Sequence, residues 1–369
     1  MALSVMFGRL LGCVVLLATG CVDDPYEPGA PLMTGASEAG GSSESDADPT
    51  GEGPTDGPAT SGASASQGTA DDDSGSTGGD EETGGTDEPT GASESDGGDP
   101  LCYSEPLNPD ADIADIVNSY GGAGFQDAVI EAMNRRYPAG AFLLDAQRDD
   151  PYWTQFSDPN SWEGMVGWLD TLVHEQTHLF NAYHAIDVGE SASLYMREDL
   201  ILYLPPEQGF ARSQILADLP PALAQSIYAD TYLTGDQGTR GFGSLLDETA
   251  CYVNEVPGMS VFGEYFGGFG LSLRDGSAAM LVFLEFYLRR ARTQDPDFYA
   301  WAQSQPAYVE AVQLLWQRTQ FFYEAVADDH PSLGISDGEY RAEAELEANL
   351  DELRMFTGVG LQAGPCIDP

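Results

Sequence analysis

The stretch from residue 22 to residue 100 most strongly limits what this chain can fold into. Gly, Ser, Thr, Asp, Glu, Ala and Pro dominate it, and it contains no Lys or Arg and almost no aromatic residue. Such a segment cannot bury enough apolar surface to offset the conformational entropy lost on ordering. We therefore expect residues 22–100 to form a disordered acidic linker. Its Gly and Ser content and its like charges favour an extended coil with an average reach on the order of 50 Å.

The first 21 residues have the pattern of an export signal. Arg9 precedes an apolar run that is too short to span a bilayer, and small residues then lead directly to Cys21. Small residues before a cysteine resemble the lipobox of bacterial lipoproteins. The resemblance implies a signal peptide over residues 1–21, lipidation of Cys21 and attachment to the membrane through that lipid. Val22, in place of an acidic residue, favours the outer membrane or cell surface over the inner membrane.

Composition changes near Leu101, where aromatic residues, Leu and Arg become frequent. Residues 101–369 are enough for one large domain with a single core. Apolar periodicity predicts an α+β fold that is predominantly helical. The expected helices are 112–136 with a break at Gly121–Gly122, one that starts near Trp162 after the cap signal Asp158–Ser161, 213–232 interrupted at Pro220–Pro221, 245–255 ending before Pro257, 277–292, 307–326 and 337–353. The expected short strands are 142–144 and 200–204.

The charge of the chain is strongly one-sided. Its formal net charge is −47, and it contains no Lys, so all 14 basic residues are Arg. Nucleic acids and anionic lipids are bound largely through cationic side chains. We therefore expect no nucleic-acid partner and a membrane contact that depends on the lipid alone. The sequence leaves the oligomeric state open.

The cysteines outside the signal region suggest one disulfide. Cys102 and Cys366 lie at the two edges of the predicted domain. An oxidising exported compartment permits disulfides, and domain termini often lie close together. We predict that these two cysteines pair and that Cys251 is a buried thiol.

A short histidine-rich segment carries the clearest chemical signal. Three of the four histidines fall between positions 174 and 184, and His174-Glu175-Gln-Thr-His178 has the spacing H-E-x-x-H. On a helix, residues i and i+4 lie on one face, so both imidazoles can bind one Zn²⁺ at roughly 2.0–2.1 Å. Neighbouring apolar residues give this helix a core-facing surface. We therefore expect a metal site.

This motif resembles that of the zincin metallopeptidases. The resemblance covers the motif helix and one further helix, and it implies a zincin-like catalytic domain with Zn²⁺ as cofactor. In that family the Glu of the motif does not bind the metal. It accepts a proton from the zinc-bound water and passes it toward the leaving amine. Glu175 is the corresponding residue here, and the implied partner is a peptide or protein substrate.

The sequence offers two candidates for the third ligand. Glu248, in Leu245-Leu-Asp-Glu-Thr-Ala-Cys-Tyr252, resembles the Glu ligand on the second helix of gluzincins, and we favour it. The alternative is His184, because His174 to His184 matches the metzincin spacing H-E-x-x-H-x-x-G/N-x-x-H. That alternative requires a turn at Asn181. If the helix continues instead, His184 lies about 240° past His178 and faces away from the metal.

Two functions follow from these residues. The first is a membrane-tethered, zinc-dependent peptidase with Glu175 as general base and Tyr252 as a candidate donor to the oxyanion. The second is a zinc-binding surface lipoprotein, or a binding module with a zincin-like fold, that does not cleave. Retention of Glu175 favours the enzyme, because a structural site needs no general base. A metal ligand from Cys251 favours the second, because a closed site leaves no position for water.

Overall fold

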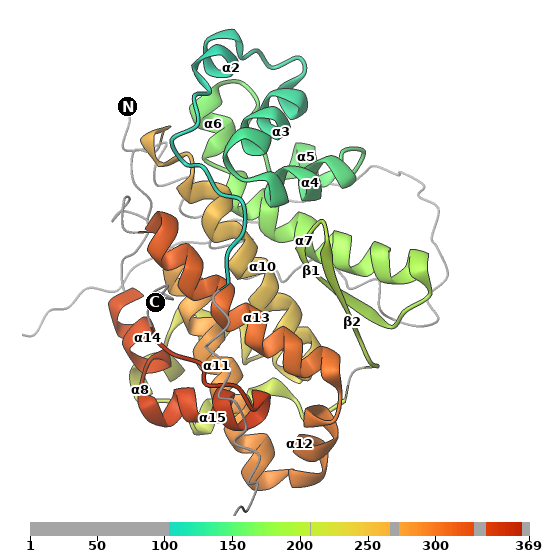
Figure 1. Ribbon diagram of the computed structural model, residues 1–369, viewed down its shortest axis with the longest axis vertical. Helices are drawn as coiled ribbons and strands as arrows, with labels where there is room; N and C mark the ends of the chain where they lie inside the picture. The colour runs from blue at the N-terminus through green and yellow to red at the C-terminus, as the bar shows by residue number, and fades with distance from the viewer. Residues whose placement is uncertain (1–102, 207, 266–272, 328–336, 364–369) are drawn as a thin grey trace, which may run out of the picture. The chain divides into compact units, whose positions relative to one another are not determined.

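Helices make up most of the described residues, as the sequence predicts, and one small sheet completes an α+β fold. The computed structural model describes residues 103–206, 208–265, 273–327 and 337–363 (Figure 1). Cys21, the linker 22–100 and the predicted Cys102–Cys366 pair lie outside the described residues. Among the helices that are described, none is long and apolar enough to cross a membrane.

The elements follow one another in the order shown in Figure 1. The first part of the domain contains α2 (Ala114–Ser119), α3 (Phe125–Arg136), α4 (Pro138–Ala146), α5 (Tyr152–Gln155), α6 (Trp162–Val166), α7 (Leu169–Val188), β1 (Ala192–Arg197) and β2 (Leu200–Leu204). The second part contains η1 (Arg212–Ala217), α8 (Pro221–Ala224), α9 (Ile227–Tyr232), η2 (Gln237–Thr239), α10 (Phe242–Ser260), η3 (Gly263–Tyr265), α11 (Leu273–Gln294), α12 (Pro296–Gln303), α13 (Pro306–Phe322), the π-helical turn η4 (Tyr323–Ala327), α14 (Asp337–Ala344) and α15 (Glu347–Thr357).

Helix α10 is the centre of the fold. It packs against α7 on one side and against α11 and α13 on others, and it also contacts β1 (Figure 1). Its apolar side chains Leu245, Leu246, Val253 and Val256 are all buried. At about 25 cal/mol per Å² of buried apolar surface, each fully buried aliphatic side chain contributes roughly 1.5–3 kcal/mol before entropy is subtracted. The α7–α10 contact is therefore a rigid part of the core.

Helix α7 carries the histidine motif, and it begins later than the sequence predicts. The cap signal is correct, because the Ser161 hydroxyl accepts a hydrogen bond from the backbone N–H of Gly164. That cap opens only the short helix α6, however, and α7 begins at Leu169. Helix α7 then runs without interruption to Val188 and ends at Gly189, whose φ of 78° is the left-handed conformation that glycine adopts without strain.

The sheet is a single antiparallel hairpin that packs on α7. Strand β1 pairs with β2 in the register Ala192↔Leu204 and Leu194↔Leu202. The sequence predicts β2 but not β1. Strand β1 packs against α7, α4 and α10, and its four central residues are all buried, including the polar Ser193, so its burial does not follow the alternation that marks a half-exposed strand.

Further sequence-based expectations about the elements are wrong, among them the single helix 337–353, which is divided into α14 and α15. Residues 142–144 belong to helix α4, because Pro138 opens a helix at its first position and Leu143 and Leu144 face the core. Helix α10 does not end before Pro257 but continues to Ser260. An internal proline costs about 3 kcal/mol, and buried Val256 and Val261 on either side of it supply compensating packing.

Helix α11 is buried nearly all round and contains one acidic residue in its core. From Ala278 to Leu288 every residue of α11 is buried, including Glu285 at 0% exposure. Neither carboxyl oxygen of Glu285 has a hydrogen-bond partner among the described residues. Burial raises the pKa of Glu285 well above its ordinary value of 4.5, and nearby Arg289 opposes this only in part. The carboxyl is therefore protonated in the folded state over much of the range in which the unfolded chain ionises it.

We expect Glu285→Gln to stabilise the protein in a pH-dependent way. Because the folded pKa is raised, the parent's stability from this group is fully present below pH 4.5 and declines as the pH rises toward the folded value. The substitution should raise the free energy of unfolding, relative to the parent, by up to about 1.4 kcal/mol per pH unit above that point. Urea unfolding at a series of pH values measures this. The exposed Glu310→Gln is the control, and a gain for Glu285→Gln that does not vary with pH would contradict the prediction.

Candidate metal centre

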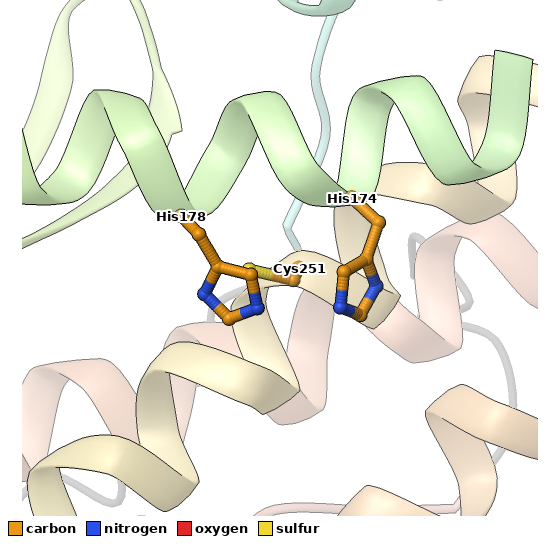
Figure 2. A group of neighbouring side chains, drawn as sticks. All are labelled: His174, His178 and Cys251. Atoms are coloured by element: carbon orange, nitrogen blue, oxygen red, sulfur yellow. The ribbon is translucent and has the colours of Figure 1, made fainter. Parts of the chain in front are cut away.

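The two motif histidines project from one side of α7 toward α10. They are one helical turn apart, and their rings lie 5.0 Å apart, centroid to centroid, at 72° (Figure 2). His174 is buried and the side chain of His178 is 15% exposed. The pair therefore lies in the α7–α10 interface, with only the His178 side close to solvent.

A carboxylate from α10 fixes each imidazole ring. His174 Nδ1 is 2.9 Å from Glu255 Oε2, and His178 Nδ1 is 2.6 Å from Asp247 Oδ2. Because a carboxylate accepts, each Nδ1 carries the proton and donates it. When each ring is neutral, its lone pair is then on Nε2, which is the tautomer that binds a metal, and carboxylate partners of this kind orient metal-binding histidines.

Glu248 of α10 faces the two Nε2 atoms from the opposite helix. Its Oε2 lies 3.4 Å from His178 Nε2 and 3.7 Å from His174 Nε2. Two ligands bound to one zinc at 2.0–2.1 Å in tetrahedral geometry are about 3.3–3.4 Å apart. Both distances are therefore close to the spacing of ligands that share one ion.

The state of Glu248 also fits a cation ligand. The side chain is 3% exposed, and its Oε2 has no hydrogen-bond partner among the described residues. Burial by itself raises the pKa of this carboxyl, but the His178 and His174 imidazoles in their protonated state and the Arg212 guanidinium outweigh burial and hold the pKa well below the usual range. A buried, ionised oxygen directed at two imidazole nitrogens is what a divalent cation needs.

Cys251 lies beside the same pair. Ligand atoms of His174, His178 and Cys251 all fall within 4.8 Å of one another, and Figure 2 shows the thiol next to the His178 ring. Burial raises the pKa of the Cys251 thiol to about 12. As expected from the sequence, this cysteine is buried, and it pairs with no other described cysteine. It is a second candidate to complete a site with the two histidines.

His184 lies away from this centre, because the turn at Asn181 does not form. Asn181 is helical, and its side chain instead donates to Asp247 Oδ1 at 2.6 Å and accepts from the Tyr195 N–H at 2.7 Å. His184 stacks on Phe180, and its Nε2 is 3.0 Å from the Tyr203 hydroxyl. The structure therefore does not bring His184 together with His174 and His178, as the metzincin-type alternative for the third ligand requires.

Tyr252 supports the site from the side of His174. Its ring lies edge-on to His174 with centroids 4.8 Å apart, and its hydroxyl is 2.9 Å from the hydroxyl of Tyr232. The residue is buried, and burial raises its pKa. This contact shows Tyr252 holding the His174 ring, while its role as an oxyanion donor stays a prediction.

Glu175 is half-buried and follows His174 on the adjacent face of α7. Its charge contributes to the environment of Glu255, whose pKa burial raises to about 7 against the opposing hydrogen bond from His174. Glu175 is therefore close to the histidine side of the site and is more accessible than Glu255, while Asp247 is half-buried as Glu175 is.

The sequence did not single out Asp247, Glu255 or Arg212 as contributors to this centre. Residues 248 and 255 are seven apart, or two helical turns, and this spacing is the one signal that could have linked Glu255 to Glu248. No spacing connects Arg212 to the site, because it comes from η1 and meets Glu248 only in the folded chain.

Comparison with family profiles, curated proteins and solved structures gave no match for this chain. Any function must therefore follow from the residues of the site themselves.

We expect Asn181→Ala to weaken the junction of α7, α10 and the hairpin. The substitution leaves the buried Tyr195 N–H and one oxygen of Asp247 without their partner. An unsatisfied buried group costs about 1–3 kcal/mol, more than the roughly 0.5 kcal/mol that alanine gains in helix propensity. Urea unfolding measures the loss. Ile186→Ala on the same helix, 61% exposed, should change stability by under about 0.5 kcal/mol, and an equal effect of both would contradict the prediction.

Proposed function

We propose that this protein is a zinc-dependent peptidase of the zincin type, with His174, His178 and Glu248 as metal ligands. The observation that supports this most strongly is that Glu248 Oε2, which has no hydrogen-bond partner among the described residues, lies 3.4 Å and 3.7 Å from the two imidazole Nε2 atoms. Three protein ligands leave a position for water, as catalytic zinc sites require. When bound, zinc polarises a carbonyl and lowers the pKa of a coordinated water toward about 7.

The chain's own residues supply the remaining chemistry. Glu175 is half-buried next to His174, so it can accept a proton from a water at the site and deliver it to the leaving amine. Glu255 and Asp247 cannot replace it, because their hydrogen bonds to His174 and His178 already hold the rings. Tyr252 is the proposed oxyanion donor, provided its hydroxyl leaves Tyr232.

We also propose that the lipid on Cys21 and the linker 22–100 place this peptidase at the outer membrane or cell surface. Its substrate is then a peptide or protein within reach of the tether. The acidic chain, at −47 formal charge, favours basic peptides through steering.

One observation favours a second function, a non-catalytic zinc site. The Cys251 sulfur lies within 4.8 Å of the ligand nitrogens of His174 and His178. If the thiolate joins the histidines and Glu248, four protein ligands close the site to water. Cobalt-substituted protein distinguishes the two, because a thiolate ligand adds an intense sulfur-to-cobalt absorption that oxygen and nitrogen ligands do not give. The absence of this absorption, with metal retained in Cys251→Ala, is expected for the peptidase.

The metal content of the purified protein tests the ligand set. We expect one zinc per parent chain, with a loss of at least about tenfold in affinity for His174→Ala, His178→Ala and Glu248→Gln. His184→Ala is the matched control and should retain the metal, because its imidazole contacts Tyr203 instead. Elemental analysis after dialysis gives the stoichiometry. A parent protein without metal, or a loss of zinc only in His184→Ala, would contradict the proposed site.

Glu175→Gln tests the catalytic assignment. Because Glu175 orients and deprotonates water but binds no metal in this scheme, the variant should keep its zinc and lose about 10²–10⁴-fold in rate. A library of internally quenched peptides, screened against the parent, provides the substrate for this measurement. A variant that cleaves as fast as the parent, or a parent that holds zinc but cleaves no peptide, would favour the non-catalytic function.

A further inference from the structure

Arg212 is a buried cation at the far side of the metal centre. It opens η1, and its side chain is 0% exposed. Its Nε donates to the Gln237 carbonyl oxygen at 2.8 Å, its Nη2 donates to the side-chain oxygen of Gln237, and its guanidinium lies over the Tyr232 ring at 5.6 Å. The backbone N–H of Arg212 also donates to the Arg240 carbonyl at 2.7 Å. The guanidinium is therefore held in one place by η2 and α9.

This guanidinium faces the carboxylate that we assign as the third ligand. Arg212 Nη2 is 3.8 Å from Glu248 Oε1, and the side chains are 0% and 3% exposed. The other oxygen, Oε2, is the one directed at His174 and His178. Glu248 thus directs Oε1 at the Arg212 guanidinium and Oε2 at the two imidazoles.

We propose that Arg212 is a positioning residue that directs Glu248 Oε2 to the metal by holding Oε1. This inference rests on the proposed metal site. Complete burial prevents Arg212 from meeting a substrate, so it acts through Glu248. Buried charges interact strongly when both are removed from water, and removal of one partner leaves the other uncompensated. Tyr232, which lies under the guanidinium and meets the hydroxyl of Tyr252, connects the same support to the ring beside His174.

A purely structural role makes a different prediction. The bonds to Gln237 show that Arg212 also joins η1 to η2. If that were its whole role, Arg212→Met would lower the stability of the metal-free protein but leave the affinity of folded protein for Zn²⁺ unchanged. Gln237→Met removes the side-chain acceptor of this junction while keeping the guanidinium and its bond to the Gln237 backbone carbonyl, so it is the matched control.

The test is a double-mutant cycle on metal affinity. Zn²⁺ alone is titrated against a chromophoric chelator into parent, Arg212→Met, Arg212→Lys, Glu248→Gln and Arg212→Met/Glu248→Gln, each first shown to be folded. We expect Arg212→Met to bind zinc about 10–100-fold more weakly and Arg212→Lys to recover part of the loss. In the Glu248→Gln background, Arg212→Met should have no further effect. The double variant contains no uncompensated buried charge and so provides the folded comparison if Arg212→Met alone fails to fold.

The possible results separate this inference from the proposed function. Suppose that the parent binds zinc. The role of Arg212 is overturned, and the metal site is left intact, if the zinc affinity of Arg212→Met is within about twofold of the parent's. The same conclusion follows if the losses of affinity from the two substitutions multiply in the double variant. Gln237→Met weakening zinc as much as Arg212→Met also overturns it. A parent that binds no zinc overturns both. Co²⁺ absorption of the loaded variants adds a direct readout, since a misdirected Glu248 changes the ligand field and a loss of stability alone does not.

Discussion

The contact between α7 and α10 is the interaction on which the rest of the structure depends. It places two histidines of one helix against three carboxylates of the other, and the bonds from His174 to Glu255 and from His178 to Asp247 fix both rings. Each bond crosses the interface, so the packing of apolar side chains and the orientation of the imidazoles are set together. A shift of one helix along the other would separate both pairs at once.

Buried arginines neutralise part of the negative charge near this interface. The chain is very acidic, and it buries several carboxylates where each needs compensation. Arginine side chains supply part of this compensating positive charge, in the interior as well as at the surface. Arg318, at 0% exposure, pairs with Glu105 at 3.2 Å and donates to Asn254 of α10 at 2.9 Å. Arg212 lies 3.8 Å from Glu248 Oε1, so both arginines meet side chains of α10, the helix that carries Glu248.

The open site proposed for a peptidase and the closed zinc site differ in whether the Cys251 sulfur is a metal ligand. Glu248 and Cys251 lie three residues apart on α10, so both face α7, and either can join the two imidazoles. A carboxylate oxygen without a hydrogen-bond partner among the described residues can accept a cation directly, whereas a buried thiol must first lose its proton. This asymmetry, together with a half-buried Glu175 next to His174, is why the open site is the preferred proposal.

The sequence by itself determined the helical class, the motif helix and the pair His174 and His178, because a spacing of four residues on a helix needs no distant contact. It also pointed to Glu248, through a resemblance rather than through geometry. Only the tertiary structure decided that α7 continues past Asn181, since Asp247 and the Tyr195 N–H satisfy that side chain and remove the turn that His184 needed. The sequence likewise did not predict the contacts of Glu255 and Asp247 with the imidazoles or of Arg212 with Glu248. Partners from 25 to 81 residues apart along the chain meet only when the helices pack.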